Sequence, residues 1–193
     1  AVDCTGHGVP GALMSMIGFS KLNAISHKKN SDPGYILEKL DEGVREALSS
    51  KRYNHESKDG MDMALCAFDL KNKKVQYSGA FRPLIKINGE NLEETKGNRY
   101  PIGGGSSYIK DGFTTHEFDI NKGDCFYMFS DGFPDQFGGP KDKKFMNKKF
   151  KALLQEIQFL SPKDQTLRLD TELKNWRGET EQVDDVLVIA VCF

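Results

Sequence analysis

The stretch GDCFYMFSDG, residues 123–132, runs from an apolar, strand-like segment directly into an acidic turn. Two further acidic motifs lie beside apolar runs: DCTGHG at residues 3–8 and DDV at residues 184–186. A folded chain could gather the carboxylates of the three motifs at one edge of a sheet. Hard divalent cations require such a cluster, because they prefer oxygen ligands.

Composition bounds the class of protein. The chain has 193 residues, 38% of them apolar, which is enough to bury a substantial core in one domain. Its 27 basic and 28 acidic residues nearly cancel, and the lysines within residues 141–151 are interpreted as a solvated surface, so a nucleic-acid partner is not expected. No stretch approaches the roughly 18 apolar residues of a membrane helix. A soluble, cytoplasmic domain without membrane contact is therefore expected, although its parent protein could be tethered to a membrane sensor.

The cysteines give no metal or disulfide signature. They have no CxxC spacing, and each lies in or beside an apolar run. We expect buried thiols in a reducing cytosol at all four positions: Cys4, Cys66, Cys125 and Cys192.

Apolar spacing predicts helices first and strands afterwards. Two helices are expected after the first acidic turn, over residues 10–25 and 33–48, the second capped by Asp32. Short strands should follow as an antiparallel meander, at residues 61–70, 74–78, 84–87, 113–118 and 125–129. Two more helices, over residues 148–158 and from the Ser161–Pro162 cap towards Trp176, should precede a last strand over residues 186–193. This order predicts a layered α+β domain.

Six segments occur in the order seen in the bacterial SpoIIE/RsbU branch of the metal-dependent protein phosphatases. They are DCTGHGVPGALMSM, DGMDMALCAFDL, YSGAFRPLIKI, PIGG, GDCFYMFSDGFPDQFGG and DDVLVIAV. The resemblance covers essentially the whole chain and implies a single domain over residues 1–193, folded as an αββα sandwich of antiparallel sheets flanked by helices. It further implies two Mn²⁺ or Mg²⁺ ions and removal of phosphate from phosphoserine or phosphothreonine in a protein.

Carried over residue by residue, the resemblance implies a set of metal ligands. They are Asp3, Asp131 and Asp184, with the Cys4 backbone carbonyl as a further ligand and Asp185 as a second choice. Taken singly, Ser-Asp-Gly is ordinary turn chemistry, and a pair of aspartates can be a solvated strand start. The shared order of all the motifs favours the metal site.

For four other residues, a functional and a structural interpretation both stay open. His7 could donate a proton to the leaving alkoxide, or it could be a structural turn histidine. Arg82 could bind phosphate through two nitrogens, or it could be a surface arginine. Asp59 and Asp62 could support an additional, weaker metal, but a polar strand entrance is the favoured interpretation.

Two further tracts are interpreted from their glycines. Gly103, Gly104 and Gly105 lack the lysine of a phosphate-binding P-loop, so a tight turn is expected. The tract over residues 133–145 is a candidate flap over the site. The family's first metal-binding motif and first strands should precede residue 1, so we expect the chain to be part of a longer protein whose excised domain could be inactive.

Two functional classes stay open. The first is a protein serine/threonine phosphatase, the output domain of a bacterial signalling protein with an upstream sensor or receiver domain, acting on a phosphorylated anti-sigma-factor antagonist. The second is a catalytically deficient domain that binds a phosphoprotein. A hydrolase of small phosphate compounds is a third alternative, which no adenine-binding or base-stacking signature supports.

Overall fold

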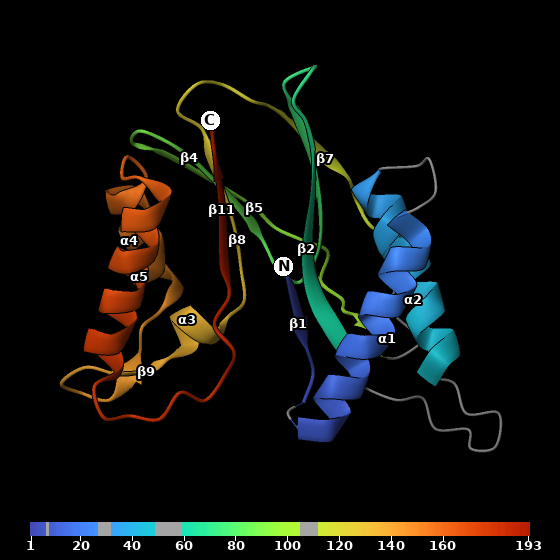
Figure 1. Cartoon of the computed structure of the whole chain (residues 1–193), viewed down its shortest axis with the longest axis horizontal. Helices are drawn as coiled ribbons and strands as arrows, with labels where there is room; N and C mark the ends of the chain where they lie inside the picture. The colour runs from blue at the N-terminus through green and yellow to red at the C-terminus, as the bar shows by residue number, and fades with distance from the viewer. Residues whose placement is uncertain (7, 27–31, 49–58, 105–111) are drawn as a thin grey trace. The chain divides into compact units, whose positions relative to one another are not determined.

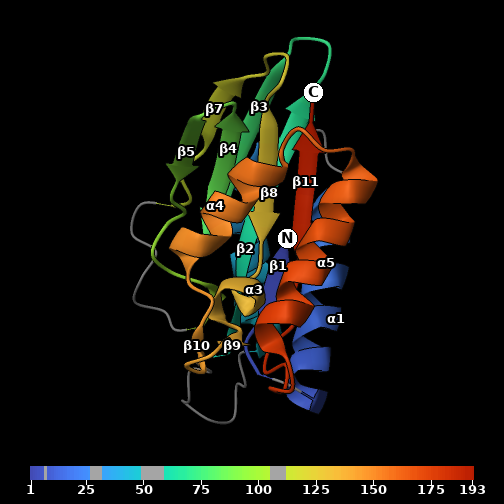
Figure 2. The same ribbon diagram turned by 90° about the vertical axis from the view of Figure 1, so that its left-hand side faces the viewer.

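The computed structural model describes residues 1–6, 8–26, 32–48, 59–104 and 112–193 (Figures 1 and 2). They divide into two compact units. Unit 1 comprises residues 1–84 and 95–121, and unit 2 comprises residues 85–94 and 122–193. Across the described ranges, no helix combines the length and apolar character needed to span a membrane.

Unit 1 is built on an antiparallel sheet of five strands. Four of them lie in the order β1 (Val2–Cys4), β2 (Gly60–Asp69), β3 (Lys74–Ala80) and β7 (His116–Asp119), and β6 (Ile102–Gly103) also pairs with β2. The register between β1 and β2 sets Asp3 directly opposite Asp62. Two carboxylates therefore meet across one strand pair.

Helix α2 (Pro33–Leu48) packs against the unit 1 sheet as its sequence predicts. The Asp32 side chain accepts a hydrogen bond from the Tyr35 N–H at 2.8 Å, so the expected N-cap is confirmed. Leu37, Leu40 and Val44 are fully buried in one cluster with residues of β2. The apolar stripe of this helix is thus the core of unit 1.

Helix α1 (Gly8–Ser26) forms where it was predicted, beside α2 (Figure 1), but its apolar residues are not all buried. Leu13, Met16 and Phe19, which follow helical spacing in the sequence, are more than half exposed. Helix α1 approaches β2 closely at Gly18, where a Cβ would lie 2.7 Å from the Met61 methyl group.

Unit 2 contains a four-stranded sheet with the order β11 (Val188–Cys192), β8 (Cys125–Phe129), β4 (Leu84–Asn88) and β5 (Asn91–Thr95). Two helices, α4 (Asn147–Ile157) and α5 (Pro162–Arg177), lie against it (Figure 2). Ser161 caps α5 by accepting the Asp164 N–H at 3.2 Å. All five residues of β8 are buried, so this strand is the centre of the unit 2 core.

Six short elements of the described residues were not predicted, namely β1, β5 and β6 and three further ones. Helix α3 (Gly132–Asp135) follows the acidic turn directly, and β9 (Phe137–Gly138) pairs with β10 (Lys143–Lys144) in a two-stranded sheet. Elements this short carry no periodic pattern in the sequence. The tract over residues 133–145, the candidate flap, thus contains regular structure, and its strand β9 contacts α5. Its role as a flap stays a prediction.

The prediction of one continuous meander was wrong. The strands are antiparallel as predicted, but β4 pairs with β8 in the second sheet and not with β3. The chain leaves the first sheet at Phe81, whose φ of 58° is incompatible with a continuing strand. Each unit is an antiparallel sheet flanked by helices, so the α+β class is confirmed.

The prediction of four buried thiols was wrong for two cysteines, and the other two are free thiols that are only partly buried. Cys125 and Cys192 face each other across the β8–β11 pair and form a disulfide, whereas Cys4 and Cys66 are free thiols. A cross-strand pair of this kind has no spacing signature, because it depends on the register of strands far apart in the sequence. Burial raises the pKa of the Cys66 thiol to about 12.

Candidate metal centre

In unit 2 the two predicted carboxylates lie close together. Asp131 and Asp184 each offer one carboxylate oxygen, and these two atoms lie within 4.8 Å of each other. Asp131 follows the end of β8, and Asp184 precedes β11. Because Phe129 pairs with Val188, the register of the two strands brings both acidic motifs to the same edge of the sheet.

The serine of the SDG motif joins these two motifs. The Ser130 hydroxyl donates to the Asp185 carbonyl at 2.8 Å and accepts the Leu187 N–H at 2.9 Å. The Ser130 N–H also donates to the Leu187 carbonyl at 3.0 Å. Ser130 is only 4% exposed, so these bonds are sheltered from competing water.

The glycine of the same motif has a steric role. A Cβ at Gly132 would lie 2.3 Å from the Asp185 carbonyl oxygen, so only glycine permits this approach of the two backbones. Sequence reasoning did not assign a role to Ser130 or Gly132, although both belong to the motif that it singled out. Together they fix the backbone positions from which Asp131 and Asp184 project.

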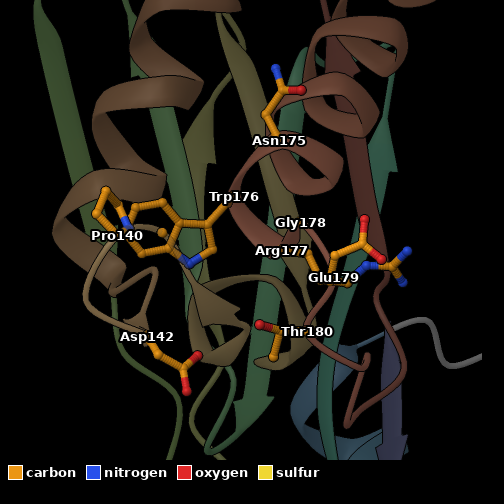
Figure 3. Close-up of a pocket in the computed structure, with 9 residues that line it drawn as sticks. Pro140, Asp142, Asn175, Trp176, Arg177, Gly178, Glu179 and Thr180 are labelled. Carbon is orange, nitrogen blue, oxygen red and sulfur yellow. The ribbon is translucent and has the colours of Figure 1, made fainter.

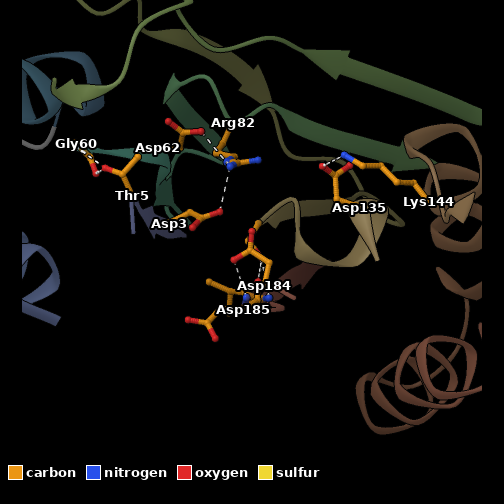
Figure 4. A network of polar contacts seen from close by, with 11 residues as sticks. Asp3, Thr5, Gly60, Asp62, Arg82, Asp135, Lys144, Asp184 and Asp185 are labelled. Carbon is orange, nitrogen blue, oxygen red and sulfur yellow. Dashed lines mark hydrogen bonds and ion pairs between the residues drawn. The ribbon is translucent and has the colours of Figure 1, made fainter. Parts of the chain in front are cut away.

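The DDV motif has its own local order. The Asp184 side chain accepts the Asp185 N–H at 2.8 Å, and the Asp184 carbonyl accepts from the Gln182 side chain at 2.9 Å (Figure 4). Both aspartates are exposed. The backbone of Asp185 binds Ser130, while the role of its carboxylate as a second-choice ligand stays a prediction.

In unit 1 the predicted ligand Asp3 is paired with a cation from its own unit. Nη2 of Arg82 lies 3.0 Å from Oδ2 of Asp3 and 3.0 Å from Oδ2 of Asp62 (Figure 4). The Arg82 side chain is only 14% exposed, so Arg82 is not a freely solvated surface arginine. One guanidinium therefore compensates two carboxylates, and phosphate binding by Arg82 stays a prediction.

The backbone holds Arg82 firmly in this place. The Tyr77 hydroxyl donates to the Arg82 carbonyl at 2.5 Å, and the Arg82 N–H donates to the Ala80 carbonyl at 2.7 Å. Tyr77 itself is fully buried. The guanidinium consequently extends from a rigid turn at the end of β3.

The remaining predicted positions have different outcomes. His7 and Gly105 lie outside the described residues. The φ of Gly103 is +86°, and its N–H donates to the buried Asp41 side chain at 2.8 Å, which agrees with a tight turn. Asp62 faces Asp3 at a strand entrance. An additional metal at Asp59 and Asp62, and the Cys4 carbonyl as a ligand, stay predictions.

The donor chemistry of unit 2 fits a hard cation. Oxygen ligands bind Mg²⁺ or Ca²⁺ at about 2.0–2.6 Å, so two oxygens on opposite sides of one ion are separated by about 4–5 Å. The oxygens of Asp131 and Asp184 meet this limit. Two carboxylates at such a distance repel each other, and a bound cation would relieve that repulsion.

Comparison with known proteins places the chain in a family. The whole chain, residues 1–193, matches the family described as stage II sporulation protein E (SpoIIE). The chain belongs to the SpoIIE family. No curated protein gives a sequence match. The family predicted from the six motifs is confirmed.

Solved structures similar to this SpoIIE-family chain are phosphatase domains. The SiaA-PP2C domain of Pseudomonas aeruginosa is 30% identical with a TM-score of 0.87, and the match covers 100% of this chain and 74% of that chain. The PP2C phosphatase domain with a fragment of the regulatory domain of SpoIIE from Bacillus subtilis is 18% identical with a TM-score of 0.74, covering 98% and 51%. The catalytic domain of the serine/threonine phosphatase PstP, in complex with two manganese ions, is 16% identical with a TM-score of 0.64, covering 98% and 84%.

These likenesses confirm the fold class. The predicted αββα class, antiparallel sheets flanked by helices, is that of the PP2C-type neighbours. The two relatives below 25% identity show the fold alone, whereas the SiaA domain also supports the family. The SpoIIE-family chain spans about half the length of the Bacillus subtilis structure.

Proposed function

We propose that the chain is a PP2C-type protein serine/threonine phosphatase domain that hydrolyses phosphoserine and phosphothreonine in proteins. One observation carries the proposal: in a chain of the SpoIIE family, the carboxylate oxygens of Asp131 and Asp184 lie within 4.8 Å of each other. The PP2C character of the SiaA domain supports the same reaction class.

The proposed cofactors are two divalent cations, Mn²⁺ or Mg²⁺. The two manganese ions bound by PstP, a structural neighbour, support this assignment. The resemblance of the motifs implies Asp131 and Asp184 as ligands, with Asp185 as a second choice, and Asp3 and the Cys4 carbonyl as further ligands. When bound, such ions supply an acidified water and compensate the charge on phosphate.

The protein's own residues then have positioning roles. Ser130 and Gly132 hold the two acidic motifs of unit 2 at a fixed separation. Arg82 fixes one oxygen of Asp3 through an ion pair at 3.0 Å. Preorganised ligands of this kind lower the cost of assembling a metal site.

The organisation of the parent protein is also proposed. We infer one phosphatase domain over residues 1–193, comprising both units, in a cytoplasmic signalling protein that carries an upstream sensor or receiver domain. The regulatory domain in the Bacillus subtilis SpoIIE structure supports such an arrangement. The proposed substrate is a phosphorylated protein, with an anti-sigma-factor antagonist as the specific candidate.

A second candidate function is binding of a phosphoprotein without turnover. The Arg82 ion pairs favour it, because a guanidinium 3.0 Å from Oδ2 of Asp3 competes with a metal ion for that oxygen. Because the Arg82 guanidinium already compensates the charge of the Asp3 carboxylate, a metal ion would gain less by binding to that carboxylate.

Phosphate release from phosphoserine and phosphothreonine peptides separates the two functions. The phosphatase proposal expects release that requires Mn²⁺ or Mg²⁺ and is lost in Asp131→Asn. Peptide binding without release, in the presence of saturating metal, would support the second function. If the chain neither released phosphate nor bound the peptides, both proposed functions would be contradicted.

A further inference from the structure

An open groove lies in unit 2 between the end of α5 and the turn after β9 (Figure 3). Its volume is about 560 Å³. One wall is the turn with Gly139, Pro140 and Asp142, and the other is the segment over residues 175–180, which includes Trp176 and Arg177. The groove thus borders two segments of unit 2 that continue to Asp131 and to Asp184.

Trp176 makes the groove a preformed feature. Its indole N–H donates to the Gln136 carbonyl at 3.0 Å, and its own carbonyl accepts the Gly139 N–H at 2.7 Å. Phe145 packs edge-on against the indole at 5.3 Å between ring centroids. A Cβ at Gly138 or Gly139 would collide with Trp176, so the two glycines allow the turn to pack on the helix end.

Arg177 brings a positive charge to the wall of the groove. Its Nε is buried and has no hydrogen-bond partner among the described residues. A buried donor without a partner costs about 1–3 kcal/mol. The Arg177 side chain and the Glu179 carboxylate extend on the same side of the groove (Figure 3).

Lys141 and Lys143, which flank the lining residue Asp142, form a lysine rim beside the groove, whose own lining holds the carboxylates of Asp142 and Glu179 and the guanidinium of Arg177. Residues 141–151 contain six lysines and one aspartate, although the whole chain has a net charge of −1. Nζ of Lys149 lies 3.8 Å from the centroid of the Trp176 ring. Lys144, Lys149 and Lys151 are already paired with Asp135, Glu172 and Glu94.

We propose that this groove and its lysine rim dock an acidic segment of the phosphoprotein substrate. The Trp176 ring and Pro140 offer a contact surface, and the exposed Lys141 and Lys143, together with Arg177 in the wall, complement acidic residues beside the phosphorylated one. The inference rests on the proposed function, since the partner is its substrate. It adds that acidic flanking sequence, and not phosphate alone, selects that partner.

The single tryptophan of the chain makes the groove directly observable. The probes are two peptides with a non-hydrolysable phosphonate in place of phosphoserine, one flanked by glutamates and one by glutamines. Affinity is measured by anisotropy of a dye on the peptide, and location by Trp176 fluorescence, both with Mn²⁺ present. We expect about tenfold tighter binding of the acidic peptide, a change in Trp176 emission, and loss of the preference at high salt.

A matched pair of variants tests the rim. Lys141→Glu with Lys143→Glu should weaken binding of the acidic peptide about tenfold, as two charge reversals at an interface rim predict. Lys122→Glu with Lys163→Glu changes the net charge equally at exposed positions of unit 2 that do not line the groove, Lys163 being at the opposite end of α5, and should leave the affinity unchanged.

Three results would overturn the proposal. They are equal affinity for the two peptides, binding without any change in Trp176 emission, and tighter binding of an oligonucleotide or of anionic lipid vesicles than of the acidic peptide. None of these measurements needs turnover, so failure of the proposed phosphatase activity is detected separately, by p-nitrophenyl phosphate hydrolysis.

Discussion

The Ser130 hydroxyl and the Asp185 carbonyl are joined by a 2.8 Å hydrogen bond across 55 residues of sequence. The same hydroxyl accepts the Leu187 N–H. The serine of the SDG motif is therefore hydrogen-bonded to the backbone of the DDV motif and of the residue that follows it. This relationship sets the separation of Asp131 and Asp184 before any metal is bound.

Ser130→Ala should lower both stability and metal affinity. The variant leaves the Asp185 carbonyl and the Leu187 N–H without the Ser130 hydroxyl as their partner, so the free energy of unfolding should fall by about 1 kcal/mol. The Mn²⁺ concentration at half-maximal activity should rise, measured alongside urea denaturation. Ser78→Ala is the control, since the Ser78 hydroxyl is buried without a partner among the described residues. Its removal should be neutral or stabilising; equal effects of both variants would contradict this account.

Gly132→Ala should separate the two acidic motifs. Its Cβ would meet the Asp185 carbonyl oxygen at 2.3 Å, and a displacement of about 1 Å at a catalytic site can cost about 100-fold in rate. We expect a loss of that order in kcat/KM for p-nitrophenyl phosphate. Gly43→Ala, inside α2 and against the flexible Lys21 side chain, should instead stabilise by about 0.5–1 kcal/mol. Full activity of Gly132→Ala would disprove the steric role.

Asp131→Asn should raise the stability of the metal-free protein. Removing one of two carboxylates within 4.8 Å relieves their repulsion, so Tm without metal should increase by a few degrees. Mn²⁺ should raise the Tm of the original chain by mass action but not that of the variant. Differential scanning fluorimetry measures both effects, and an equal Mn²⁺ shift in the two proteins would exclude Asp131 as a ligand.

The Cys66 thiol should be unreactive in the native protein. Burial raises its pKa to about 12, so the nucleophilic thiolate is scarce near neutral pH and increases only as the pH approaches that value. Labelling with a thiol reagent, followed by mass spectrometry, should modify Cys66 only after unfolding. In the unfolded, unreduced chain two thiols should react, Cys4 and Cys66, because Cys125 and Cys192 form a disulfide. Rapid native labelling of Cys66 would contradict the burial argument.

Local patterns in the sequence were sufficient for several elements. The capped helices α2 and α5 and the buried strand β8 were predicted because their signals, an N-cap, a helical apolar stripe and an apolar run, lie within a few residues. The exposed apolar residues of α1 were not foreseen. Its close contact with Met61 is made at Gly18, and a glycine inside a helix is usually taken as destabilising, not as a packing position.

Features that depend on distant pairing could not be predicted. The transfer of β4 to the second sheet, the Cys125–Cys192 disulfide and the Arg82 ion pairs join residues far apart in the chain. Register across a sheet is set by the whole core. Motif order nevertheless predicted that the carboxylates of Asp131 and Asp184 lie close together, because the order of the motifs reflects the same strand register indirectly.

Hydrolysis of p-nitrophenyl phosphate across a Mn²⁺ titration, compared between the original chain and its Asp131→Asn and Asp184→Asn variants, tests the central claim most directly. The account predicts saturable, Mn²⁺-dependent turnover that falls at least about 100-fold in both variants. Turnover that is independent of Mn²⁺, or that persists in both variants, would contradict the assignment of Asp131 and Asp184 as the ligands of a catalytic cation.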